Sequence, residues 1–316
     1  SSTSDLITVV NASGVRIVDL PITQVTHPSQ PQMPPQIGRA IPRDLLWDED
    51  AATLSVYCWG WNKVLIYNIN QTATPPHWLE LGPDPLPVAV QEGRSIFYDA
   101  KRPVAVDQNG APFPGAVTCG TCHPAGGMDL LAWGLSDSVK DIKDMMVTQS
   151  LLSISDTFPY HWRGERNLDH FNGAFVGLLG FEDRLEEAPG DELDQFEAFV
   201  FSLQAPANPR QDVHRKLAGF DARLGQDLFL NKQDVLFGEF TCADCHALPS
   251  GTNGENIAEV FPPNIASTAV LDVTHLRQLT HKDQTEVTVT VPTGNGSQMV
   301  AASRARGGFG ILHDGV

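Results

Sequence analysis

The pentapeptide C-x-x-C-H occurs twice in this chain, at residues 119–123 and 242–246. Two cysteine thiols at this spacing add across the two vinyl groups of a porphyrin, and the histidine that follows binds the iron. The two motifs use four of the five cysteines, so coincidence is a poor explanation. Six residues are thereby predicted to bind two covalent haem c groups: Cys119, Cys122, His123, Cys242, Cys245 and His246.

The alternative is a zinc site built from the four cysteines of both motifs. Zinc requires no histidine directly after each cysteine pair, yet His123 and His246 stand at that position in both motifs. The repeated histidine therefore favours haem. The fifth cysteine, Cys58, lies in an apolar run at residues 54–59 and is expected to be a buried small hydrophobic residue.

The composition limits which class of protein this chain can be and which partners it can bind. With 316 residues, of which 41% are hydrophobic, the chain can bury more than one core. A formal net charge of −17 argues against nucleic acid and anionic membrane surfaces as partners. The chain has no run of 18 apolar residues, so membrane insertion is not predicted. Because c-type haem is attached outside the cytoplasm, the expected location is periplasmic or extracellular.

The first 90 residues are predicted to form a β-rich segment. Four short runs of β-branched and aromatic residues occur there, and residues 11–14 suit a hairpin turn between the first two. These runs lie at residues 7–10, 15–18, 54–57 and 64–67. Proline-rich stretches separate the pairs, and the pattern resembles one or two blades of a β-propeller. The segment either packs on the haem-binding part as a small sheet or belongs to something longer; its tryptophans, including Trp47 and Trp59, are expected to serve packing.

After residue 90 the pattern becomes helical and repeats. A Gly-x-x-hydrophobic-Phe stretch precedes each haem motif, at residues 93–97 and 225–229, and a glycine-containing loop follows each. Residues 191–203 have the apolar periodicity of an amphipathic helix, which we expect to close the first module by crossing its opening helix. No such helix is predicted for the second module, and we expect the chain to be truncated at its C-terminus.

We therefore predict an α+β multidomain chain. Its expected parts are a β-rich segment at residues 1–90, a first cytochrome c domain at 91–205 and a second at 206–316. Both cytochrome domains are expected to be mainly α and similar to class I cytochromes c.

A family resemblance agrees with this organisation. The order Gly-x-x-[Ile/Leu]-Phe, C-x-x-C-H, Leu-Arg and His-Asp-Gly across residues 91–316 resembles the di-haem cytochrome c peroxidase superfamily. The resemblance implies that Trp162 lies between the two haems as an electron relay; an ordinary core tryptophan is the alternative. His161 and Arg163 depart from the family's pattern, which favours an uncharacterised branch, some of whose members carry a propeller. Family members often bind calcium, for which Asn172 and the acidic residues near 183 would supply oxygen ligands.

The sixth ligand of each iron separates electron transfer from enzyme chemistry, because an open iron can meet a small oxidant. For the first haem the candidates are Met146 and, as its rival, His161. For the second haem they are Met299 and His281, with His275 as a further rival.

Two arginines are candidates for binding haem propionates. The guanidinium groups of Arg163 and Arg277 suit a carboxylate, and an ordinary surface ion pair is the alternative for each.

The leading functional prediction is electron transfer outside the cytoplasm through two c-type haems. One alternative is a peroxidase-like oxidoreductase with one open haem, and another is a haem-bearing subunit or fragment of a larger electron-transfer assembly. The expected partner is accordingly a redox protein or a small oxidant.

Overall fold

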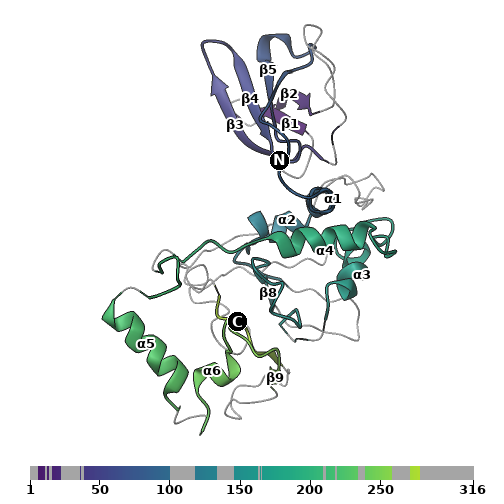
Figure 1. The fold of residues 1–316 in the computed structure, drawn as a ribbon. Coiled ribbons are helices and arrows are strands. Elements are labelled where there is room, and N and C mark those ends of the chain that lie inside the picture. The colour runs from purple at the N-terminus through teal and green to yellow at the C-terminus, as the bar shows by residue number, and fades with distance from the viewer. Residues whose placement is uncertain are drawn as a thin grey trace. The chain divides into compact units, whose positions relative to one another are not determined.

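The protein forms two compact units. The fold contains both helices and strands (Figure 1). Unit 1 contains Ser1–Cys122 and Asn172–Ser202, and unit 2 contains His123–Phe171 and Leu203–Val316. The predicted domain limits at residues 90 and 205 stay predictions. The structure, a computed structural model, describes residues 6–10, 13, 16–22, 36, 39–99, 118–133, 146–162, 164, 166–208, 211–217, 219–233, 239–257 and 271–277.

The N-terminal part of unit 1 contains two antiparallel sheets. The first is a hairpin of β1 (Leu6–Val10) and β2 (Arg16–Pro21), as the sequence predicted. The second has four strands in sequence order, with the short 3-10 turn η1 (Ile69–Gln71) before the last strand. Its strands are β3 (Pro42–Asp48), β4 (Thr53–Cys58), β5 (Lys63–Asn68) and β6 (His77–Glu80). The predicted runs at 54–57 and 64–67 are thus confirmed as β4 and β5.

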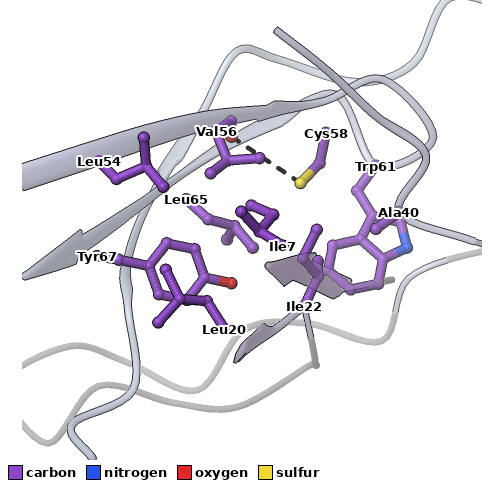
Figure 2. Close-up of a cluster of buried hydrophobic side chains, with 10 residues drawn as sticks. All are labelled: Ile7, Leu20, Ile22, Ala40, Leu54, Val56, Cys58, Trp61, Leu65 and Tyr67. Atoms are coloured by element: carbon purple, nitrogen blue, oxygen red, sulfur yellow. Dashed lines mark hydrogen bonds between the residues drawn. The ribbon is translucent and has the colours of Figure 1, made fainter. Parts of the chain in front are cut away.

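The hairpin and the four-stranded sheet share one apolar core. Alternate residues of β4 and β5 are buried, which is the period-two pattern of a strand with one covered face. Val56 and Leu65 are completely buried, and Ile7 and Leu20 of the hairpin belong to the same cluster (Figure 2). Cys58 is also completely buried there, as expected of a small hydrophobic residue.

Helices α1 (Val88–Phe97) and α4 (Glu192–Ser202) pack on each other in unit 1. They approach closely at Gly93, where a Cβ atom would lie 1.8 Å from the carbonyl oxygen of Gln195 and 2.8 Å from Cβ of Phe199. The ring of Phe97 lies with its centroid 5.3 Å from that of Phe199. The helix predicted at residues 191–203 is therefore confirmed, together with its packing on the helix that precedes the first haem motif. Helix α3 (Asn172–Gly177) completes this part of unit 1.

Buried arginine contacts join the four-stranded sheet to α1. Arg94 is almost fully buried; it forms an ion pair with Asp84 and donates to the carbonyl oxygen of Gly60 at 3.0 Å. Arg39, which precedes β3, forms a 2.9 Å ion pair with Asp99 just beyond α1. These contacts pack the four-stranded sheet on α1 within unit 1. That the β-rich segment belongs to something longer stays a prediction.

Unit 2 contains mostly short elements, and the helix of the second haem motif is among them. Strands β7 and β8 pair antiparallel, as do β9 and β10. The elements are η2 (Pro124–Gly126), β7 (Ala132–Trp133), β8 (Met146–Val147), η3 (Asp169–Phe171), α5 (Phe220–Asn231), α6 (Cys242–Cys245), β9 (Asn256–Ile257) and β10 (Leu271–Asp272). Among the helices of the described residues, none is both long and apolar enough to cross a membrane.

Replacement of Gly93 by alanine is expected to destabilise unit 1. The added methyl group would force α1 and α4 apart, because the carbonyl oxygen of Gln195 occupies its place, at a cost of about 1–3 kcal/mol in the free energy of unfolding. Gly225→Ala is the matched control, since Gly225 holds the same position in the second repeat and a Cβ there meets no described atom within 4 Å.

The control is expected to be neutral or stabilised by about 0.5–1 kcal/mol, because alanine favours the helical backbone. Chemical denaturation followed by circular dichroism measures both variants. Equal effects at the two glycines would contradict the packing of α4 on α1.

Candidate haem-attachment sites

The first motif begins as a one-turn helix, α2 (Cys119–Cys122), in unit 1. Thr118 precedes it: its N–H donates to Oγ1 of Thr121 at 3.0 Å, and its carbonyl oxygen accepts the Thr121 N–H at 2.9 Å. Burial raises the pKa of the Cys119 thiol to about 12, with a further contribution from Cys122. The two cysteines are thus presented from one turn, and both are half-buried.

The second motif has the same form with different neighbours. Helix α6 follows Thr241, whose N–H and hydroxyl both donate to Oδ2 of Asp244, at 2.6 and 2.9 Å. These hydrogen bonds lower the pKa of the Asp244 carboxyl. Desolvation raises the pKa of the Cys245 thiol, and the Asp244 charge adds to the effect. Cys242 is exposed, whereas Cys119 and Cys122 of the first motif are half-buried.

Both motif histidines use the same ring nitrogen for a backbone contact. Nδ1 of His123 lies 3.2 Å from the carbonyl oxygen of Gly127, and Nδ1 of His246 lies 3.1 Å from that of Gly251. Because a carbonyl oxygen only accepts, Nδ1 must carry the proton in each ring. The neutral tautomer then has its lone pair on Nε2, the atom that an iron ligand needs.

The protonation of the first histidine also suits ligation. Burial lowers the pKa of His123, which favours the neutral imidazole. Backbone contacts with Gly127 and Gln149 and the Asp129 charge act in the opposite direction and are smaller than the effect of burial.

Glycines shape the loops that carry the accepting carbonyl groups. Gly126 has φ +79° and Gly251 has φ +83°, a region that favours glycine. A Cβ at Gly126 would lie 2.9 Å from Cδ1 of Leu203, and one at Gly251 would lie 2.9 Å from the backbone nitrogen of Leu276. The glycine loops predicted after each motif are therefore required by both conformation and space.

The donors fit a covalent haem at both motifs. Each has two thiols on one helical turn, followed by a histidine whose Nδ1 is held by a loop carbonyl. Within the described part of the chain, no three His, Cys, Asp or Glu side chains gather in a group that could hold a metal ion.

The predicted sixth ligands are placed only in part. Met146 begins β8 and pairs with Trp133 of β7; its side chain lies outside the described residues. His161 is half-buried in a turn with φ +76°, and its ring centroid lies 6.0 Å from that of Phe171. Met299 and His281 lie outside the described residues, as does Arg163.

Trp162 is buried in unit 2, with an exposed fraction of 4%. Its carbonyl oxygen accepts the backbone N–H of Asp272 at 2.9 Å. Its role as a relay between haems stays a prediction.

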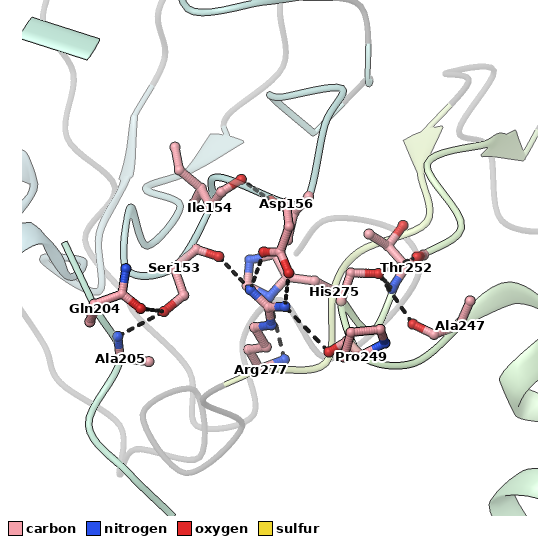
Figure 3. Close-up of polar contacts among 12 residues, drawn as sticks. Ser153, Ile154, Asp156, Gln204, Ala205, Ala247, Pro249, Thr252, His275 and Arg277 are labelled. Atoms are coloured by element: carbon pink, nitrogen blue, oxygen red, sulfur yellow. Dashed lines mark hydrogen bonds and ion pairs between the residues drawn. The ribbon is translucent and has the colours of Figure 1, made fainter. Parts of the chain in front are cut away.

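Arg277 forms a bidentate ion pair with Asp156 within unit 2 (Figure 3). Nη1 and Nη2 each lie 2.6 Å from one carboxylate oxygen, and the guanidinium also donates to the carbonyl oxygens of Ser153 and Pro249. These hydrogen bonds lower the pKa of Asp156. The ion pair that the sequence left as an alternative is therefore present, and propionate binding by Arg277 stays a prediction.

Sequence reasoning missed Asp272. Its Oδ1 atom is buried and has no hydrogen-bond partner among the described residues. Burial raises the pKa of this carboxyl to about 7. The signal in the sequence is a single acidic residue inside the apolar run at residues 269–273.

Asn172, a candidate calcium ligand, uses its side chain to hold a turn. Its Oδ1 accepts the Leu185 N–H at 2.9 Å, and its Nδ2 donates to the Leu185 carbonyl oxygen at 2.9 Å and to Glu187 Oε1 at 2.7 Å. Calcium binding stays a prediction.

Comparison with known proteins gives one distant likeness. No protein-family model matches the chain, and no curated protein matches it. A solved structure of Kuenenia stuttgartiensis hydrazine synthase pressurized with 20 bar xenon has a TM-score of 0.42 and 16% identity, covering 61% of this chain and 70% of that chain. A likeness at this level assigns neither a fold nor a function.

Asp272→Asn is expected to make the protein more stable than the native chain as pH rises. The native carboxyl has a pKa of about 7, above its unfolded value, so its contribution to stability is present in acid and is lost towards pH 7. Asparagine has no such loss; the difference in unfolding free energy should grow between about pH 4 and 7, to roughly 1–2 kcal/mol after allowance for partial exposure.

Asp156→Asn is the control of opposite sign. The Asp156 pKa is lowered, so that carboxyl stabilises the native state above its ordinary pKa and the benefit disappears in acid. This variant should be destabilised most at neutral pH. Urea unfolding at several pH values measures both, and a pH-independent effect of Asp272→Asn would contradict the assignment.

Proposed function

We propose that this chain is a di-haem c-type cytochrome that transfers electrons in the periplasm or outside the cell. The observation that supports this best is the repeated donor set. In both motifs a short helix presents two cysteines, and the following histidine is held through Nδ1 by a loop carbonyl, at 3.2 Å for His123 and 3.1 Å for His246. A zinc site has no need of this repeated histidine geometry.

Each residue of the motif has a definite task in this proposal. The cysteines bind the porphyrin covalently, and Nε2 of the histidine binds the iron. The loop carbonyl orients the ring and makes the nitrogen at the other side more basic. Burial lowers the pKa of His123, which favours the neutral imidazole that a ligand needs, and it raises the pKa of the Cys119 thiol. When bound, haem supplies one-electron chemistry by alternating between ferric and ferrous iron.

Met146 is the sixth ligand that we propose for the first haem. It lies three residues before Gln149, whose backbone interacts with the His123 ring. Two hydrogen bonds hold this segment beside the loop that follows the motif: Thr148 N–H donates to the Leu131 carbonyl oxygen at 3.1 Å, and Leu151 N–H to that of Gly126 at 2.8 Å. These contacts hold the segment that begins with Met146 beside the loop after His123, which supports the proposal; His161 is the alternative.

A peroxidase-like oxidoreductase is the second candidate, and Asp272 is the observation that favours it. Such an enzyme needs a group that accepts and returns a proton near neutral pH. Asp272 is buried, has an unpaired oxygen among the described residues and has a pKa of about 7.

The proposal predicts two covalent haems per chain. Mass spectrometry of the denatured protein should find both, and the double variant Cys119→Ala/Cys122→Ala should keep one, because the second motif is untouched. A matched variant, Cys242→Ala/Cys245→Ala, should also keep one. Zinc in place of haem, or a single haem in the native chain, would overturn the proposal.

Ligand binding separates the two candidate functions. If Met146 closes the first iron, the reduced native protein should not bind carbon monoxide at that site, and Met146→Ala should bind it and lose the sulfur-to-iron charge-transfer band. Met128→Ala, which removes a methionine close after His123, is the matched control and should leave both observations unchanged. Carbon monoxide binding and peroxide turnover by the native protein would favour the oxidoreductase.

A further inference from the structure

The ring of Tyr98 packs directly on the first haem motif, within unit 1. Tyr98 immediately follows α1, and Gly120 stands between the motif cysteines. A Cβ at Gly120 would lie 2.4 Å from Cε1 of Tyr98 and 2.6 Å from Cδ1. These separations are far below van der Waals contact, so the ring fills the space that any larger residue at position 120 would need.

An arginine from the β-rich segment holds this ring in place. Nη2 of Arg43, on β3, donates to the hydroxyl oxygen of Tyr98 at 2.7 Å. The same guanidinium lies over two rings, with its central carbon 4.8 Å from the Tyr98 centroid and 4.6 Å from that of Trp59. The rings of Trp59 and Tyr98 meet edge to face with centroids 5.8 Å apart. We call Arg43, Trp59 and Tyr98 the Arg43 clamp.

Residues of α1 and α4 hold Trp59, and with it the Arg43 clamp, in place. Trp59 lies in the turn between β4 and β5, and the buried Arg94 of α1 covers its ring at 4.9 Å. Trp59 also contacts Phe199 of α4, with ring centroids 6.4 Å apart. A hydrogen bond to a charged group is stronger than one between neutral groups, and a cation–π contact adds to it, so together they fix the Tyr98 ring.

The second motif has a different pair of residues at the matching positions. Counted from the phenylalanine of each repeat, Leu230 corresponds to Tyr98; counted from the first cysteine, Ala243 corresponds to Gly120. Leucine has no hydroxyl for an arginine to hold, and alanine supplies the methyl group for which the first motif has no room. The first module thus combines tyrosine with glycine at these two positions, and the second combines leucine with alanine.

We infer that the N-terminal β-rich segment positions the first haem motif through the Arg43 clamp, and that the second motif is independent of it. This inference rests on the proposed function insofar as it concerns the haem; the packing of Tyr98 on Gly120 does not depend on it. Arg43 and Tyr98 are positioning residues. They fix α2 and thereby hold constant both the exposure of Cys119 to water and the positions of the charged groups around it. Loss of either residue should therefore lower the reduction potential of the first haem.

The packing is tested by a double-mutant cycle of Gly120→Ala and Tyr98→Leu, which together recreate the pair found in the second motif. Gly120→Ala alone should lower the free energy of unfolding, and the loss should be much smaller when Tyr98→Leu is already present. Ala243→Gly is the matched control in the second motif and should show no coupling with Tyr98→Leu. Additive effects of Gly120→Ala and Tyr98→Leu would overturn the inference.

The effect on the haem is tested by redox titration of Arg43→Met and Tyr98→Phe, each with its haem content measured by mass. Both variants remove the Arg43–Tyr98 hydrogen bond and keep most of the side-chain volume. The reduction potential of one haem should fall, and that of the other haem should stay at its native value. Arg215→Met, which removes an exposed arginine in unit 2, is the charge control and should shift neither potential.

The outcomes are distinguishable from a failure of the proposed function. If the native chain binds no haem, the proposed function is wrong, and the double-mutant cycle still decides whether Tyr98 positions the first motif. If both haems are present and Arg43→Met and Tyr98→Phe leave both potentials unchanged, or shift both equally, the clamp does not position the first haem and the inference is wrong.

Discussion

The contact of α4 with Gly93 of α1 is the constraint on which unit 1 depends. Residues 123–171 belong to unit 2, so the chain leaves unit 1 after Cys122 and returns at Asn172. Closing so long an excursion costs conformational entropy, which must be offset where the two segments meet. The close approach at Gly93 and the Phe97–Phe199 contact bury the apolar surface that offsets this cost. The departure point falls inside the first haem motif, so the fold of unit 1 fixes Cys119 and Cys122 directly.

The two motifs share their backbone design and differ in their surroundings. Both use a threonine before the helical turn and a carbonyl group that holds Nδ1 of the histidine. The first motif has a half-buried Cys119, whose thiol pKa is raised by burial, and the Tyr98 ring beside it. The second has an exposed cysteine and the ionised Asp244 within its turn. Because burial and nearby charge set the potential of a haem, two equal attachment sequences would give two unequal redox centres.

Local sequence patterns predicted much of the fold, and the predictions failed where tertiary packing determines the structure. The hairpin, β4, β5 and α4 follow from period-two and helical periodicity. Strands β3 and β6 escaped prediction because they are the two edges of the sheet, where proline next to a strand is tolerated and the burial pattern is weak. Trp47 on β3 is half exposed, not packed as predicted, because an edge strand is covered less than a central one. Asp272 was missed because its unusual pKa comes from burial, which sequence does not encode locally.

The site residues divide in the same way. Covalent attachment depends on neighbours in sequence, so the six motif residues can be proposed from the sequence alone, whereas the partner of an arginine depends on the folded chain. Both Nη atoms of Arg277 are already bonded to Asp156, and two backbone carbonyls accept from them as well. A haem propionate would have to displace that carboxylate and would gain only the difference between two similar ion pairs. With a net charge of −17 before any propionate is counted, a free cation elsewhere in the chain or on a basic partner is the more favourable counterion.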